Sequence, residues 1–298
     1  MNHIATLRFA QSIPFHGFTF PGYQSTLWAA DVQGPVQAIG AWVDGQPVGL
    51  ALSLWCPDED LARMVSLFVA PAFRRQGVAN SLLAATESGW LARGVKRLEV
   101  GYLQKSDTAD TVSRMLARQA WPQAQPERLI CACDRSMLDS KWFAREPVVP
   151  DGCDIISWSQ VSVRERAALM AEQLLDPWIP TSLNPFKYEA NAEFNSVALR
   201  EAGKIVGWVI TERYDAQTLV YSCSYMHPER QKRGWIVALY IEAVRRHATR
   251  SDLPHARWAV PYHFAPMVKF VQRWMASYAT ELQDYLVAIK NLEQPITI

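Results

Sequence analysis

The amino-acid sequence predicts an α+β protein of two domains in tandem, each with a central, mostly antiparallel sheet flanked by helices. The chain has 298 residues, which is enough for two ordinary domains that each bury a core. A strand–turn–helix pattern also occurs twice, because Pro71 and Gly77 are matched 157 positions later by Pro228 and Gly234. A repeat of this length indicates a duplicated domain, since solenoid units run to only about 20 to 50 residues.

A second repeat precedes each of these loops. Residues 44–49 read D-G-Q-P-V-G and residues 202–207 read A-G-K-I-V-G, at a spacing of 158. In both copies turn-forming residues separate two extended apolar runs, a pattern typical of a β-hairpin. One single-residue insertion or deletion accounts for the difference between the two spacings.

The first domain is predicted to span residues 1–140. A short strand at 5–9 is followed by a region at 11–35 whose prolines, glycines and aromatics favour loops and at most one short helix. Hydrophobic periodicity then predicts strands at 36–43, 47–55 and 61–69, a helix at 78–93, a strand at 97–102, a helix at 108–119 and a strand at 128–133.

The second domain is predicted to span residues 153–298, after a linker at 141–152 that contains Pro147, Pro150 and Gly152. It begins with a strand at 154–158 and a helix at 163–175, for which Ser162 is a suitable N-cap. Residues 176–188 form an aromatic, proline-rich loop. The further elements are strands at 196–201, 204–211 and 218–226, a helix at 235–249, a strand at 256–262, a helix at 266–276 and a strand at 284–290.

The overall composition restricts the function classes. Hydrophobic residues make up 49% of the chain and charged residues 20%, which is typical of a globular protein. A net charge of +1 argues against a nucleic-acid partner, because binding a polyanion generally needs a basic excess on one face. There is no apolar run of about 18 residues and no signal-peptide layout, so we expect no membrane span and a cytoplasmic protein. The five cysteines and six histidines have no metal-ligand spacing, so no metal site is predicted.

The most informative segment runs from Val69 to Ala79. An apolar strand leads into a turn with Arg74, Arg75 and Gly77, and the turn opens an amphipathic helix. The first amides of a helix have no intrahelical partner and carry the positive end of its dipole, so this arrangement suits an anion such as a pyrophosphate. The pattern R-x-x-G-x-A after V-x-P resembles the acyl-CoA pyrophosphate loop of the GCN5-related N-acetyltransferase (GNAT) superfamily, and the order of elements is similar to that fold over nearly the whole chain.

The resemblance implies a binding site for acetyl-CoA or a longer acyl-CoA. In GNAT folds the strand before the loop and the strand after its helix splay apart, and the pantetheine arm inserts between them. Leu67, Phe68 and Val69 would then line the arm, and the pyrophosphate would lie against Arg74, Arg75 and the backbone of Gln76, Gly77, Val78, Ala79 and Asn80. An acyl carrier protein is an alternative donor.

The second loop departs from the family pattern. Gln231 replaces the first arginine, Ile236 stands where the family has Gly or Ala, and Trp235 adds bulk, although Arg230, Lys232 and Arg233 keep the loop basic. We therefore expect the first domain to hold the acyl donor and the second to be a degenerate, structural or acceptor-binding copy. The opposite arrangement stays open, because only the second half has the complete helix-plus-loop region before its central hairpin.

The usual catalytic acid of the family is absent from both copies. The resemblance implies a tyrosine in the late helix, but alignment puts Leu116 and Phe270 at that position. Tyr102 and Tyr262, on equivalent strands, are alternative proton donors, although each also fits a core or interface role. Candidates for the base are His227 and, less directly, Ser66, Cys223, Glu59, Asp60 and His263.

Three functions follow from these observations. The leading hypothesis is an N-acyltransferase that moves an acetyl or longer acyl group from an acyl-CoA to a primary amine of a small molecule or peptide. The missing acid also allows a non-catalytic acyl-CoA-binding regulatory module, and a purely structural partner is the third possibility. The twelve tryptophans suit a long-chain pocket, or they simply fill two cores.

Overall fold

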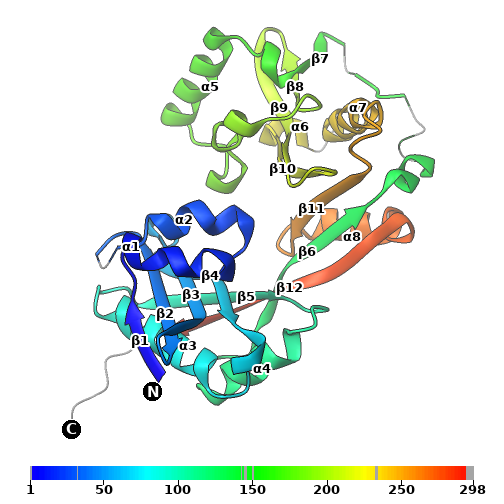
Figure 1. Cartoon of the computed structure of the whole chain (residues 1–298). Coiled ribbons are helices and arrows are strands. Elements are labelled where there is room, and N and C mark those ends of the chain that lie inside the picture. The colour runs from blue at the N-terminus through cyan, green and yellow to red at the C-terminus, as the bar shows by residue number, and fades with distance from the viewer. Residues whose placement is uncertain are drawn as a thin grey trace. The chain divides into compact units, whose positions relative to one another are not determined.

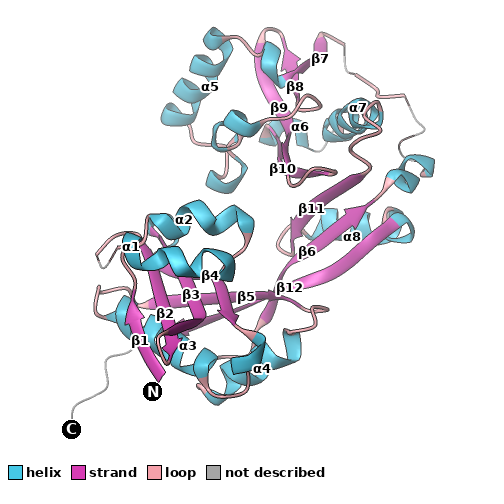
Figure 2. Cartoon of the chain, in the orientation of Figure 1, coloured by secondary structure: helices cyan, strands magenta, loops and turns pink. Residues whose placement is uncertain are grey.

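The computed structural model describes residues 2–31, 33–141, 143, 146–149, 151–231 and 234–292, whose helices and strands are shown in Figures 1 and 2. By their internal contacts the residues form two compact units. Unit 1 consists of residues 1–127 together with the chain from residue 284 onward, and unit 2 consists of residues 128–283. Helices and strands are mixed in both, which confirms the α+β class.

Unit 1 is built on a sheet with the strand order β1-β2-β3-β4-β5-β12, in which only β4 and β5 run parallel. Its strands are β1 (Asn2–Thr6), β2 (Val36–Val43), β3 (Gln46–Cys56), β4 (Leu61–Val69), β5 (Arg97–Leu103) and the C-terminal part of β12 (Ala279–Asn291). Its helices are α1 (Phe9–Ser12), α2 (Gln24–Trp28), α3 (Val78–Leu91) and α4 (Ala109–Arg118).

The first 35 residues differ from the sequence prediction. The first strand ends at Thr6 rather than residue 9, and residues 11–35 hold parts of two short helices and two 3-10 turns, at Ile13–Phe18 and Pro21–Tyr23. The reason is tertiary: Phe15 and Leu27 are fully buried against Ala38, Leu50 and Leu52 of the sheet. Burying these two side chains orders a segment whose prolines and glycines alone favour loops.

Helices cover both faces of the unit 1 sheet. α3 and α4 bury Leu82, Leu83 and Leu116 against one face, while the segment with α1 and α2 covers the other. The buried Trp90 of α3 also donates its indole N–H to Ser53 Oγ of β3 at 2.7 Å. The helix that follows the candidate anion loop is therefore fixed to the sheet along its length.

Unit 2 repeats this plan. Its strand order is β7-β8-β9-β10-β11-β6, again with one parallel pair, β10 and β11. The strands are β6 (Gln125–Cys133), β7 (Cys153–Ser157), β8 (Val197–Glu201), β9 (Lys204–Arg213), β10 (Thr218–Met226) and β11 (His255–Pro261). The helices are α5 (Val163–Leu175), α6 (Pro228–Gln231), α7 (Trp235–Ala248) and α8 (Ala265–Trp274).

The duplicated hairpins have the same backbone geometry. Asp44 and Gly45 have positive φ angles of 48° and 81°, and Ala202 and Gly203 have 47° and 80°. Two successive left-handed residues between paired strands define the tight turn whose twist matches that of the strands. The repeat seen in the sequence is therefore a repeat of structure.

The last strand of each unit comes from the other half of the sequence. Residues Tyr285–Asn291 of β12 pair with β5 in unit 1, and Arg128–Cys133 of β6 pair with β11 in unit 2. The structural units therefore differ from the sequence boundaries of 1–140 and 153–298, and part of the expected linker at 141–152 lies outside the described residues. Strand pairing depends on which sheet edge a strand reaches, and local sequence does not encode that choice.

The swapped strand makes a close contact with β5 at Gly101. A methyl group added at Gly101 would overlap the phenol oxygen and ring of Tyr285, which lies over this glycine. We expect Gly101→Ala to destabilise unit 1 by roughly 1–3 kcal/mol, the usual range for overpacking. Chemical denaturation measures this, and combining the change with Tyr285→Ala should restore most of the loss. An additive double mutant would show that the contact is not the cause.

Candidate active site

The parallel strands β4 and β5 separate part-way along their length. Ala62 of β4 is paired with Leu98 of β5, and the pairing of the two strands ends at Met64 and Val100. The β3–β4 register shifts at this point and leaves Val65 as an extra residue, a β-bulge. Bulges bend a strand and increase its twist, so β4 turns away from β5 beyond Met64. Leu67, Phe68 and Val69 lie on the part of β4 that has left β5.

The anion loop predicted from the sequence leads from this strand into α3. Gly77 occupies the N-cap of the helix with a φ of 83°, and no side chain caps the helix there. Arg74, Arg75, Gln76 and Gly77 are all exposed. The uncapped start of α3, with the positive end of the helix dipole, therefore lies next to two exposed arginines.

Three features give the loop its shape. The Nε of Arg74 donates to the carbonyl oxygen of Val69 at 3.0 Å, which ties the loop back to the end of β4. Arg75 has a φ of 62°, a left-handed conformation that is uncommon for a residue with a side chain. Gln76 Nε2 donates to Ala72 O at 3.1 Å. The loop is therefore held in place by hydrogen bonds to the end of β4 and within the loop itself.

Unit 2 contains the same fork and loop at matching positions. β10 and β11 are paired from Thr218 and His255 to Tyr221 and Trp258, and the β9–β10 register shifts at Ser222, 157 positions after Val65. Gly234 is the N-cap of α7 with a φ of 71°, again without a side-chain cap. The fork and the loop are therefore properties of the duplicated fold.

The second loop has lost part of its charge. Gln231 Nε2 donates to Met226 O at 3.0 Å, the counterpart of the bond from Arg74 to Val69, but an amide carries no charge. Arg230 forms ion pairs with Glu201 at 3.0 Å and Glu229 at 3.2 Å. Lys232 and Arg233 lie outside the described residues. The second copy therefore retains the hydrogen bond to the end of the strand but lacks the positive charge that Arg74 carries in the first.

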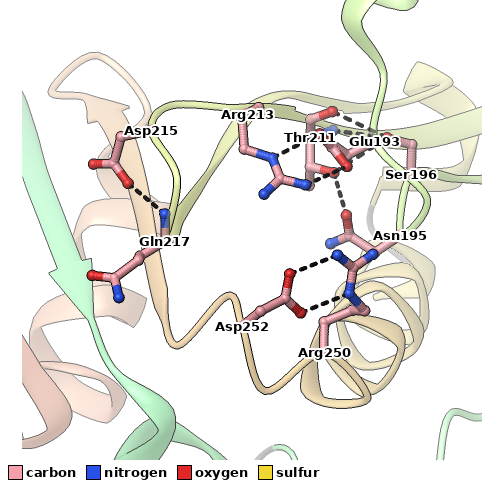
Figure 3. A network of polar contacts seen from close by, with 9 residues as sticks. All are labelled: Glu193, Asn195, Ser196, Thr211, Arg213, Asp215, Gln217, Arg250 and Asp252. Carbon is pink, nitrogen blue, oxygen red and sulfur yellow. Dashed lines mark hydrogen bonds and ion pairs between the residues drawn. The ribbon is translucent and has the colours of Figure 1, made fainter.

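A network of polar side chains joins β9, β10 and α7 in unit 2, and part of it is seen in Figure 3. Thr211 Oγ1 donates to Asn195 Oδ1 at 2.5 Å, and Asn195 Nδ2 donates to Ala243 O at 3.3 Å and Tyr221 Oη at 3.5 Å. Tyr221 also contacts His247 Nδ1 at 3.3 Å, and the other ring nitrogen of His247 lies 2.9 Å from Leu253 O. Burial raises the pKa of Tyr221 and lowers that of His247, so both are neutral at pH 7.

The three tyrosine and histidine candidates occupy different surroundings. Tyr102 is half-buried on β5 and packs against the core beneath α3 and α4, while Tyr262 packs against the cluster under α8. The ring of His227 lies edge-on to Trp178 at 4.6 Å, and its Nδ1 accepts from the backbone N–H of Glu229 at 3.4 Å. Tyr102 belongs to unit 1 and the other two to unit 2.

Two of the remaining base candidates, Cys223 and Glu59, are held by structural contacts. Cys223 donates to Leu183 O at 3.0 Å and accepts from Trp208 Nε1 at 3.3 Å, and burial raises the pKa of its thiol to about 12. Glu59 pairs with Arg63 at 2.8 Å. Asp60 lies in a turn with a φ of 49°. The late helix positions hold the buried Leu116 and the half-buried Phe270, neither of which carries a proton to donate.

Sequence reasoning did not find Tyr285. Its phenol lies over Gly101, the first residue of β5 beyond the last pair with β4, and thus beside the fork of unit 1. The only signal in the sequence is a glycine within a strand, which often marks a close approach of another group. Nothing local indicates that the approaching group lies 184 positions further along the chain, at residue 285.

Among the described residues, no group of three or more His, Cys, Asp or Glu side chains is placed to hold a metal ion. None of the helices in the described parts of the chain is both long and apolar enough to cross a membrane.

Comparisons with known proteins agree with this geometry. Residues 5–110, which contain the fork and the anion loop of unit 1, match the family model "Acetyltransferase (GNAT) family". A tandem GNAT protein from the clavulanic acid biosynthesis pathway has a similar structure, with a TM-score of 0.73, 12% identity and coverage of 99% of this chain and 100% of that one. No curated protein sequence matches the chain.

Two further solved structures have the same overall fold. A GCN5-related N-acetyltransferase from Sphaerobacter thermophilus has a TM-score of 0.60 at 14% identity, covering 100% of this chain and 98% of that one. A probable N-acyltransferase from Enterococcus faecalis has a TM-score of 0.59 at 11% identity, covering 98% and 73%. At these identities the structures establish the fold, and the family model supports acyl transfer as the general activity. Residues 5–110 therefore match the GNAT family model, and the chain as a whole has the fold of a tandem GNAT protein.

Proposed function

We propose that the protein is an N-acyltransferase that binds an acyl-CoA in unit 1 and transfers its acyl group to a primary amine of a small molecule or peptide. The observation that carries the proposal is the combination of fork and loop in unit 1. An opened β4–β5 pair leads directly to an uncapped helix N-terminus with Gly77 at its start and two exposed arginines beside it. These are the features that an extended thioester with a pyrophosphate requires.

The residues have separate tasks in this proposal. Arg74, Arg75 and the amides of residues 76–80 hold the pyrophosphate, and the free edge of β4 at residues 67–69 positions the pantetheine arm. The amine nitrogen attacks the thioester carbonyl and forms the amide bond, the carbon–sulfur bond breaks, and the leaving thiolate takes up one proton while the amine loses one. Positioning supplies much of the rate in such a reaction.

We further propose that Tyr285 supplies the proton to the thiolate. Its phenol lies beside the fork at Gly101, whereas the late helix offers only Leu116. Tyr285→Phe is expected to lower kcat by about 100-fold, the lower end of general acid contributions, while KM for the acyl-CoA stays unchanged. A comparable rise in KM for the acyl-CoA, or an unchanged kcat, would contradict the assignment.

A thiol-release assay with acetyl-CoA, longer acyl-CoAs and a panel of amines and peptides tests the activity itself. Turnover that depends on an amine supports the transferase. Acyl-CoA binding without turnover above the background rate of hydrolysis would instead favour a non-catalytic acyl-CoA-binding module. The absence of a tyrosine at positions 116 and 270 is the observation that favours this second function.

A further inference from the structure

Unit 2 has a partly open cavity of about 460 Å³ between α7 and α8, over the fork of β10 and β11. Pockets for small molecules are typically about 300–1,000 Å³ in volume, so this space is large enough for one. Its wall includes Met226 at the end of β10 and Phe270 on α8. The loop residue Leu183 and Tyr225 also line it. These two pack with the cluster of Trp208 and Cys223, whereas Met226 packs with the α7 side of the sheet, so the cavity reaches through the fork.

The cavity is elongated along α7. Its lining includes Ile236, Val237, Tyr240, Val244 and His247, which recur at helical spacing and so form one face of the helix. From Ile236 to His247 the helix rises by about 16 Å. All but His247 are only half-buried, although most of them are large and apolar. A chain-like ligand fits this shape better than a compact one.

The lining is apolar and flexible. Four methionines contribute to it, Met137, Met226, Met267 and Met275, and methionine side chains adapt readily to irregular ligands. Four of the polar side chains pair with one another: Tyr240 with Ser224, and Tyr221 with His247. The charged side chains in the lining, Asp134 and Arg135, come from the turn after β6, and Arg135 donates to Ala248 O at the C-terminal end of α7. A ligand of this cavity therefore has an apolar body.

The end of the cavity nearest the second loop is poorly suited to a pyrophosphate. Ile236 lines the cavity where the family has a small residue, and the neutral Gln231 replaces the arginine of the first copy. In unit 1 the loop retains two exposed arginines beside an uncapped helix start. The two copies thus differ at the position that recognises phosphate, while the fork behind it is open in both.

We propose that unit 2 binds an aliphatic chain of medium length in this cavity, independently of the anion loop of unit 1. The chain belongs either to a free fatty acid or to the acyl group of a thioester, since the cavity wall recognises only the alkyl part. Its binding energy comes from methylene groups transferred out of water, each worth about 0.8 kcal/mol. This site is distinct from the acyl-CoA site proposed in unit 1.

Isothermal titration of the full chain with dodecanoate tests the proposal. Binding to the unmodified protein is expected, and Val244→Trp, which places an indole inside the cavity, should weaken it by roughly tenfold or more. Leu174→Trp is the matched control, because it adds the same side chain on α5 at a position that is 85% exposed. Circular dichroism of the three proteins checks that each is folded.

A second set of titrations compares dodecanoate with dodecanoyl-CoA as the source of the aliphatic chain. It also distinguishes binding in unit 2 from binding in unit 1. Dodecanoate binding should be unchanged by Gly77→Asp, which acts on the loop of unit 1. If only dodecanoyl-CoA binds, and Val244→Trp weakens it while Gly77→Asp does not, the chain belongs to a thioester and the proposal holds. Absence of dodecanoate binding together with dodecanoyl-CoA binding that Val244→Trp leaves intact overturns it, as does dodecanoate binding unaffected by Val244→Trp. Neither result bears on acetyl-CoA binding in unit 1.

Discussion

Replacing Gly77 with Asp is expected to weaken the binding of acetyl-CoA by at least about 100-fold. Gly77 has a φ of 83° at the N-cap of α3, and a carboxylate there would face the pyrophosphate across the first amides of the helix. Like charges at such short range are costly where the dipole otherwise favours an anion. Space is not the limitation, because an added Cβ meets nothing within 4 Å. Isothermal titration with acetyl-CoA measures the effect.

Matched variants isolate the charge. Gly77→Asn has the shape of Asp without its charge and tolerates the left-handed conformation, so it should lose much less affinity. Gly234→Asp makes the same change in unit 2 and should leave acetyl-CoA binding intact. If Gly234→Asp abolishes binding and Gly77→Asp does not, the donor site lies in the second unit and the assignment is reversed.

Arg74 offers a further control within the same experiment. Arg74→Gln copies the residue found at position 231, where the amide keeps the bond to the end of the strand. This variant should retain the loop structure and lose about tenfold in affinity, an effect that shrinks as salt is added. Arg74→Glu should lose more. Equal affinity for all three proteins would mean that the guanidinium does not contact the pyrophosphate.

Ending the chain at Gln283 is expected to unfold unit 1. The missing part of β12 pairs with β5 over seven residues, Tyr285–Asn291, and it includes the buried Ala288. Lys290 Nζ also donates to Glu87 at 2.7 Å and Gln119 O at 2.9 Å. The free energy of unfolding of unit 1 should fall by more than about 5 kcal/mol, which is comparable to the whole stability of a small domain. Hydrogen exchange of β5 amides and limited proteolysis measure it.

A chain ending at Leu292 is the matched control. Every contact just named lies before residue 293, so this protein should retain protected β5 amides and a protease-resistant unit 1. The isolated fragment 1–140 makes the same point, because it leaves one edge of β5 uncovered and should aggregate. If the chain ending at Gln283 keeps full protection in β5, the swapped strand is not required for unit 1.

The strand–turn–helix segment at residues 69–79 and the duplication were predictable because both are local. Proline, arginine and glycine at fixed spacing specify a strand end, a turn and a helix start, and the same order recurs 157 residues later. The hairpins at 44–45 and 202–203 were predictable for the same reason. The first 35 residues were harder, since Phe15 and Leu27 acquire their burial only from the sheet that they cover.

The sequence by itself determined the α+β class, the tandem repeat and the turn that opens α3 at Gly77, because short-range stereochemistry at glycine and helix termini is enough to encode them. Tertiary structure decided the rest. Which edge the strands β6 and β12 join, the position of Tyr285 over Gly101 and the cavity along α7 all depend on contacts between residues far apart in the chain. Such contacts are selected by the packing of whole elements, and no single segment carries the information for them.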